Sequence, residues 1–321
     1  MTTLAATSRF GRRLARGMTV DDVGYQASTP PSASCLFSVD VEDWFHILDL
    51  PSSPNLTEWD HLPSRVEANF RNLLDLFDEH DAKVTCFFLG WVAKKFPSLL
   101  RDAAQRGHEI ASHGLSHQLV YSMTPDDFFA DITKAKSIIE DVVGKAVFGY
   151  RCPGFSVTEA TPWFFDLIAK AGYTYDSSVF PAPRGHGGLA NATHRRPYVV
   201  ESSYGRIVEV PISVVPVPVI GRPMCFFGGG YLRLFPYRVI NEMTARLLRE
   251  GSPVTFYVHP REIDPGQPKL KMGFNRHFKS YVGLRTTRSK IDRLMKDFSF
   301  RTFGAYADSF ASAPAPQEKQ Q

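Results

Sequence analysis

The sequence has no long apolar run, few cysteines and no marked excess of either charge. Its 321 residues include 37 Lys and Arg against 33 Asp and Glu, a formal net charge of +4. No stretch is long and apolar enough to span a bilayer. The basic residues form no stripe of the kind found on nucleic-acid-binding proteins. We therefore expect no integral membrane segment and no nucleic-acid partner, and the sequence leaves the oligomeric state open.

The four cysteines fit no zinc-ribbon spacing. Cys35 and Cys86 lie in apolar, strand-like runs, where a buried free thiol is the usual state, although a disulfide depends on distances that a sequence does not give. Arg12 and Arg13 could begin a twin-arginine export signal, but acidic residues follow where the apolar part of such a signal should stand. We therefore expect a cytoplasmic protein. Residues 1–33 and 311–321 are expected to be a flexible lead-in and a disordered tail.

Short apolar runs alternate with amphipathic helical segments over most of the chain. The expected strands are 35–39, 84–89, 109–112, 147–150, 173–175, 207–210 and 254–258. The expected helices begin at a capping box of Ser64 and Glu67, at 97, at Thr124, at Thr161 and at 236. This alternation predicts parallel strands joined by crossover helices, in either a barrel or a doubly wound open sheet. Residues 180–206 are polar and rich in Gly, Pro and His, which is typical of an active-site loop or insertion.

Chemically capable side chains follow the predicted strands. They are Asp40, Glu42 and Asp43 after the first strand, His113 and His117 after the third, Arg151 after the fourth, Asp176 after the fifth and His259 after the last. Since the carboxyl ends of parallel barrel strands meet at one face, these side chains are expected to lie together.

His113 and His117 have a spacing that lets two imidazoles point the same way over one helical turn and bind one ion. Such pairs also occur by chance. The acidic run of Asp40, Glu42 and Asp43 supplies carboxylate, although alone it would be read as a solvated turn. Imidazole and carboxylate together suit Zn²⁺ or a similar divalent ion, so the two features together predict a metal site.

Four further residues have a structural and a chemical interpretation each. Arg151 could hold a carboxylate ionised, and the N–H of Gly154 could donate to a developing oxyanion, or both could belong to an ordinary strand-to-loop turn. His259 is a candidate general acid if a metal lies nearby and a structural residue otherwise. Asp176 could support His259 or cap a turn.

The order of these motifs resembles the polysaccharide deacetylase family, that is, the NodB-homology domain or carbohydrate esterase family 4, over about residues 35–258. The matching strings are Ser38-Val39-Asp40 with the following acids, His113 to His117, Arg151-Cys152-Pro153, Asp176-Ser177 and Tyr257-Val258-His259. Strings beginning at Asp40, Gly228 and His259 resemble more narrowly the exopolysaccharide deacetylases of exosortase (PEP-CTERM) loci.

The chain departs from the family pattern at two places. Val41 stands where the family has the Asp that binds the metal, so Glu42 or Asp43 must replace it, and the sequence does not decide between them. The Trp that usually follows the fourth motif is absent near Asp176, and Phe180 or another aromatic residue would take its place.

The resemblance implies a distorted (β/α)7 barrel, with one domain over residues 34–310 and a C-terminal extension from about residue 260. It implies hydrolysis of N-acetyl groups on an N-acetylhexosamine-containing polysaccharide or its precursor. Since that precursor could be lipid-linked, the expected cytoplasmic protein could associate with membrane-bound glycan synthesis.

His113, His117 and Glu42 or Asp43 would hold Zn²⁺, with Co²⁺ or a similar ion as alternatives. Asp40, oriented by Arg151, would be the base, His259 the acid and Asp176 its support. Trp44, Gly154, Phe155 and Tyr231 would contact the sugar. The alternatives are an amidohydrolase acting on peptidoglycan, chitin-like oligomers or a small non-sugar amide, and a non-catalytic glycan-binding relative.

Overall fold

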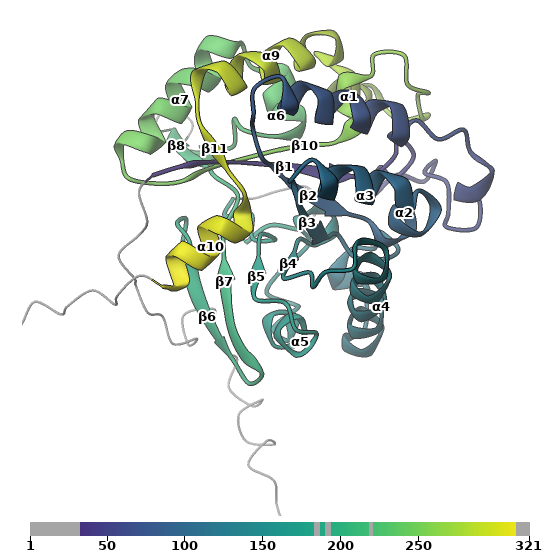
Figure 1. Ribbon diagram of the computed structural model, residues 1–321. Helices are drawn as coiled ribbons and strands as arrows, with labels where there is room; N and C mark the ends of the chain where they lie inside the picture. The colour runs from purple at the N-terminus through teal and green to yellow at the C-terminus, as the bar shows by residue number, and fades with distance from the viewer. Residues whose placement is uncertain (1–32, 183–186, 190–193, 218–220, 313–321) are drawn as a thin grey trace, which may run out of the picture.

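A curled sheet of mostly parallel strands forms the centre of the molecule (Figure 1). The computed structural model describes residues 33–182, 187–189, 194–217 and 221–312, so nearly all of the two expected terminal segments lies outside the described residues. Its main sheet runs in the order β10-β1-β2-β3-β4-β5-β7-β6. The strands are β1 Cys35–Val41, β2 Thr85–Phe88, β3 Glu109–Ser112, β4 Gly149–Tyr150, β5 Tyr175–Asp176, β6 Tyr198–Ser202, β7 Gly205–Glu209 and β10 Val254–Val258.

Seven of these strands are parallel, and only β6 pairs antiparallel, with β7. The segment that follows β7 contacts β10 through side-chain oxygens. Ser213 N donates to Thr255 Oγ1 (2.7 Å), and Thr255 N donates to Ser213 Oγ (3.0 Å). The fold is therefore an α/β fold with a curled sheet of the distorted barrel type, as predicted.

Alternating residues of the strands face two different hydrophobic layers. In β1, Phe37 and Val39 pack with the helices of the outer layer, whereas Leu36 belongs to an inner cluster. Since side chains alternate along a strand, Ser38 and Asp40 share the inner face with Leu36. The inner face thus carries the polar residues toward the carboxyl end of β1.

Helices cover the outer face of the sheet (Figure 1). They are α1 Val66–Asp78, α2 Gly90–Lys95, α3 Pro97–Gln105, α4 Pro125–Val143, α5 Phe164–Lys170 and α7 Tyr237–Arg249. The predicted start of α4 is confirmed, because Thr124 Oγ1 accepts from Asp127 N, and Gly144 ends the helix with φ +67°. The predicted capping box of Ser64 and Glu67 is wrong, because α1 starts at Val66 without a side-chain cap from its own segment.

The C-terminal third adds elements that the sequence pattern did not predict. They are α6 Gly229–Leu234, η7 Pro260–Ile263, α8 Phe274–Tyr281, α9 Leu284–Asp297, β11 Phe300–Arg301 and α10 Phe303–Ala311. In Figure 1, α10, in yellow, lies in front of the open side of the sheet. Its residues Phe303, Tyr306 and Phe310 fill the inner cluster with Leu36 and Phe87, so the amino-terminal end of the sheet's interior is packed with side chains.

Several local predictions differ from the structure. The predicted strand 147–150 shortens to Gly149–Tyr150, and the predicted loop 180–206 contains β6. Short β8 Val215–Val217 and β9 Arg222–Met224 form a separate antiparallel pair. Cys35 and Cys86 are buried free thiols, as expected. Among the described residues, the helices include none with the length and apolar content needed to cross a membrane.

Candidate active site

The carboxyl ends of the parallel strands open into a cavity of about 370 Å³. Residues after β1, β3, β4 and β10 line one side of it, and the C-terminal elements η7, α6 and α8 line the other. The predicted residues among its lining are Asp40, Glu42, His113, His117, Gly154, Phe155, Tyr231 and His259. Residues from segments far apart in the sequence therefore meet at the end of the sheet where the strand-end pattern predicted them.

Asp40 and Arg151 form a buried ion pair at the base of this cavity. Arg151 Nη1 donates to Asp40 Oδ1 at 2.7 Å, and the side chains of Arg151 and Asp40 are 0% and 2% exposed. The same nitrogen donates to Ser38 Oγ, and the guanidinium also donates to the carbonyl and hydroxyl of Ser177. Its carbon lies 4.1 Å from the ring centre of Phe87. Arg151 is thus fixed on several sides and holds Asp40 in one orientation.

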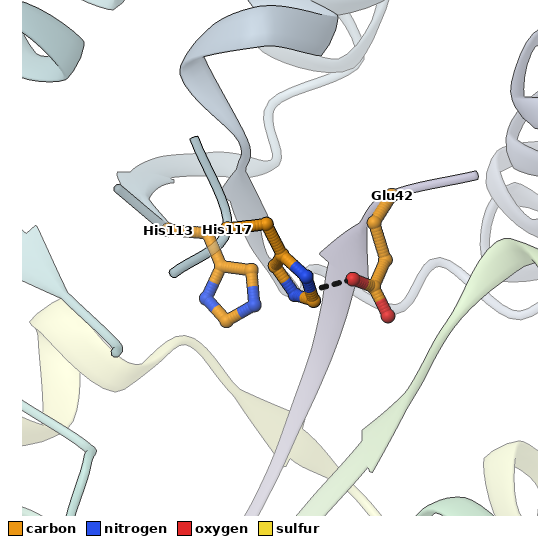
Figure 2. Close-up of side chains that lie close together, drawn as sticks. All are labelled: Glu42, His113 and His117. Atoms are coloured by element: carbon orange, nitrogen blue, oxygen red, sulfur yellow. Dashed lines mark ion pairs between the residues drawn. The ribbon is translucent and has the colours of Figure 1, made fainter. Parts of the chain in front are cut away.

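Glu42, His113 and His117 form a buried cluster whose potential ligand atoms all lie within 4.8 Å of one another (Figure 2). His117 Nε2 lies 2.6 Å from Glu42 Oε2. A tight turn in which Glu42 N donates to the Asp40 carbonyl follows β1. Glu42 and Asp40 are two residues apart, so both point to the same side of the strand end. The spacing Asp-Val-Glu therefore brings the second acid to the histidines.

The loop that presents His117 is not helical, contrary to the geometry expected from the spacing. Gly114 has φ +75° and His117 itself has φ +53°, a conformation that costs free energy in a residue with a β-carbon. Asp131 holds the loop by accepting hydrogen bonds from the backbone N–H groups of Leu115 and Ser116 and from the Ser116 hydroxyl. These hydrogen bonds to Asp131 of α4 thus fix the position of His117.

Two of the three side chains in this cluster, His113 and Glu42, have protonation states that suit a cation. Burial lowers the pKa of His113 to about 4, so its imidazole is neutral near pH 7. Its Nδ1 lies 2.8 Å from the Arg151 carbonyl; a proton on Nδ1 in that contact leaves Nε2 free as a ligand. Burial raises the pKa of Glu42, but His117 and His259 outweigh it and lower the pKa well below its usual range. Two imidazoles and one ionised carboxylate are a donor set that fits Zn²⁺ or a similar ion.

His259 lies among three carboxylates. Its Nε2 is 3.2 Å from Glu42 Oε1 and 3.9 Å from Asp40 Oδ2, and its Nδ1 is 3.5 Å from Glu262 Oε1. Burial alone lowers the pKa of His259, but Glu42 and Glu262 together raise it above its ordinary value. Glu262 is itself buried and lies 3.3 Å from Arg233 Nε. The imidazole is thus oriented from both sides and readily holds a proton.

Asp43 and Trp44 lie away from the cavity. Asp43 accepts hydrogen bonds from the backbone N–H groups of Arg65 and Val66 and from the Ser64 hydroxyl. It therefore caps α1 from outside the helix and does not face the histidines. Trp44 is buried and its Nε1 donates to the Pro63 carbonyl. Neither residue lines the cavity, which disagrees with Asp43 as a ligand and with Trp44 as a sugar contact.

Asp176 does not make the expected contact with His259. It accepts from the backbone N–H and hydroxyl of Ser178 and stands opposite Glu209 across β5 and β7. Burial raises the pKa of both carboxyl groups, that of Glu209 well above its usual value. Of the two interpretations, the turn cap agrees with these contacts, whereas the carboxylate that faces Nδ1 of His259 is that of Glu262.

His46, Arg233 and Glu262 are among the cavity residues to which the sequence interpretation gave no role. His46 is 2% exposed, its Nδ1 accepts from Asp43 N, and its ring centre lies 5.7 Å from that of His117. It follows the acidic run by only three residues, so its proximity was a detectable signal. Arg233 comes from α6, an element that the apolar pattern did not predict.

Two sequence families match consecutive parts of the chain. Residues 55–175 match the polysaccharide deacetylase family, and residues 177–308 match a domain of unknown function, DUF3473. A peptidoglycan deacetylase of Helicobacter pylori is 30% identical over 35% of this chain and 38% of its own length. A chitooligosaccharide deacetylase of Azorhizobium caulinodans is 29% identical over 25% of this chain and 38% of its own length. The matched part is thus well under half the length of these relatives.

Solved structures share the fold at low sequence identity. A chain described as a polysaccharide deacetylase of Mycobacterium smegmatis has a TM-score of 0.61 and 19% identity, covering 93% of this chain and 99% of that one. The allantoinase Puue has a TM-score of 0.59 and 16% identity, covering 90% and 96%. At such identities the likeness concerns the fold alone. Residues 55–175 are thus similar to the polysaccharide deacetylase family and residues 177–308 to DUF3473.

Proposed function

We propose that this protein is a metal-dependent enzyme that hydrolyses the N-acetyl groups of an N-acetylhexosamine-containing glycan and releases acetate. The observation that supports this most strongly is that one cavity is lined by the cluster Glu42, His113 and His117 and by Asp40, whose carboxylate is bound by the buried Arg151. Relatives described as deacetylases of peptidoglycan and of chitooligosaccharides support the reaction class.

In this proposal Glu42, His113 and His117 hold the ion, and Zn²⁺ fits their chemistry best. A bound divalent ion would supply Lewis acidity toward the acetamide carbonyl and toward water. Asp40 accepts the proton of the attacking water, since Arg151 keeps its carboxylate in place. The Gly154 N–H donates to the oxygen of the tetrahedral intermediate. His259, protonated between Glu42 and Glu262, gives a proton to the leaving amine.

The glycan is an exopolysaccharide or its precursor in this proposal, and peptidoglycan or chitin-like oligomers are the alternatives. Phe155 and Tyr231 line the cavity and would contact the sugar ring. A panel of acetylated glycans separates these substrates by their kcat/KM values. Acetate release from none of them, nor from small amides, by protein with one bound Zn²⁺ would contradict the proposed reaction and favour a glycan-binding role.

A further inference from the structure

Helix α8 turns its apolar side chains outward. Phe274 and Phe278, four residues apart and hence on one face of the helix, are 84% and 49% exposed. Within α8 only Ser280 is buried. A surface helix of a globular protein normally directs its apolar face to the core. The exposed pair of Phe274 and Phe278 therefore indicates an interaction with a partner outside the described residues.

The segment around α8 is strongly basic. Residues 265–291, which we name the basic lip, contain seven Lys and Arg and no Asp or Glu. The seven are Lys269, Lys271, Arg276, Lys279, Arg285, Arg288 and Lys290. Within the described residues only Arg288 has a carboxylate partner, Glu79. Arg276 and Lys290 donate to backbone carbonyls, which leave their charges uncompensated.

The basic lip borders the mouth of the active-site cavity. Arg276, Phe278 and Lys279 belong to its lining, together with Leu234 of α6. Leu234 is itself 48% exposed, so apolar and cationic side chains lie next to each other at the entrance. A surface that bound the basic lip would thus lie close to the cavity from which substrate enters.

We infer that the basic lip docks on an anionic phospholipid surface, with Phe274 and Phe278 inserted among the headgroups. Interfacial helices combine Lys and Arg with Phe in this way, and clusters of basic residues are drawn to anionic leaflets. An acidic glycan fits less well. Phe274, the most exposed of these side chains, is not part of the lining of the cavity that would hold the sugar. The inference goes beyond the proposed reaction and does not depend on it.

The test is co-sedimentation of the full chain with phosphatidylcholine vesicles prepared with and without phosphatidylglycerol. We expect binding only to the anionic vesicles, weakened by salt, and about tenfold weaker for Phe274→Ser/Phe278→Ser. The matched control is Phe148→Ser/Tyr204→Ser. These aromatic residues are 53% and 56% exposed and precede β4 and β7, at the opposite end of the sheet from the cavity. The control should bind like the unmodified chain, and both variants should keep its unfolding midpoint.

A second pair of variants tests the contribution of the basic side chains. Lys271→Glu/Lys279→Glu should abolish vesicle binding, whereas Lys134→Glu/Lys145→Glu, which changes the net charge equally on an exposed part of the deacetylase domain, should retain it. Absence of binding to anionic vesicles at low salt, or equal binding by the serine variant, would overturn the inference. If hyaluronan oligosaccharides bind instead, in a manner sensitive to Lys271 and Lys279, the basic lip recognises an acidic glycan and not a membrane.

Discussion

The Nε2 atom of His117 lies 2.6 Å from Oε2 of Glu42, and this contact bears on the ambiguity left by Val41. Glu42 reaches the histidine cluster because it shares a side of the strand end with Asp40. Asp43, one residue further, points the other way and caps α1. Two adjacent acids thus have separate positions, one at the cavity and one at a helix terminus.

Two isosteric substitutions distinguish these positions. Glu42→Gln should weaken Zn²⁺ binding about 100-fold or more, because the amide supplies no anionic ligand. Asp43→Asn should bind Zn²⁺ like the unmodified protein but lose about 1–2 kcal/mol of stability, because the amide caps α1 less well. Titration calorimetry and urea unfolding measure the two effects. A loss of Zn²⁺ affinity in Asp43→Asn with none in Glu42→Gln would reverse the assignment.

The buried pair of Asp40 and Arg151 should show strong coupling. Arg151→Met leaves the Asp40 carboxylate buried without its cation, which should cost about 3–5 kcal/mol in urea unfolding. Adding Asp40→Asn should restore part of that loss, although the double variant should remain inactive. Additive effects of the two substitutions on stability would mean that the pair contributes no specific interaction.

Protonation of the leaving amine should depend on His259 and on Glu262 beside it. His259→Ala should lower kcat by about 10²–10⁴-fold with little change in KM. Glu262→Gln should lower kcat less, because the imidazole stays in place with one oriented contact fewer. Steady-state kinetics on one acetylated oligomer measures both. An unchanged kcat in His259→Ala would exclude this residue as the general acid.

The free energy of unfolding should fall in mild acid because of His108. This residue precedes β3, whereas His113 of the candidate metal cluster follows the same strand. His108 is 5% exposed, its Nδ1 accepts from Val84 N, and burial lowers its pKa to about 4. Between about pH 6.5 and 4 the unfolded chain binds a proton that the folded chain does not, so stability rises with pH there. The loss on acidification from this group is at most about 3 kcal/mol.

His108→Asn keeps an acceptor for Val84 N and removes the titration. Its free energy of unfolding should therefore change less than that of the unmodified protein between these pH values. Parallel urea titrations at several pH values provide the comparison. Equal pH slopes for the two proteins would show that His108 titrates normally when folded.

The strand-end pattern predicted most of the fold and much of the cavity for a physical reason. Buried parallel strands require continuous apolar runs, and their ends are where polar groups meet. Asp40, His113, Arg151 and His259 each follow such a run, and each lies at the same end of the sheet. The alternation of side chains along β1 could also have separated Glu42 from Asp43, since Asp40 and Glu42 share a face.

Other features depend on contacts that sequence spacing does not reveal. Asp43 caps α1 from 22 residues before the N–H that it binds, whereas a capping box is recognised only within one turn. Asp176 pairs with Glu209 across two strands, and Glu262 approaches His259 in a short 3₁₀ turn. The spacing of Phe274 and Phe278 is typical of a helix, but it does not reveal that these side chains face outward.

The most direct test of the proposed reaction is acetate release from N-acetylglucosamine oligomers by protein stripped with a chelator and then resupplied with Zn²⁺ or Co²⁺. We predict no release from the stripped protein, recovery when about one equivalent of metal is bound, and no recovery for His113→Ala. Release that persists in the stripped protein, or that His113→Ala retains in full, would contradict the account of a metal-dependent deacetylase.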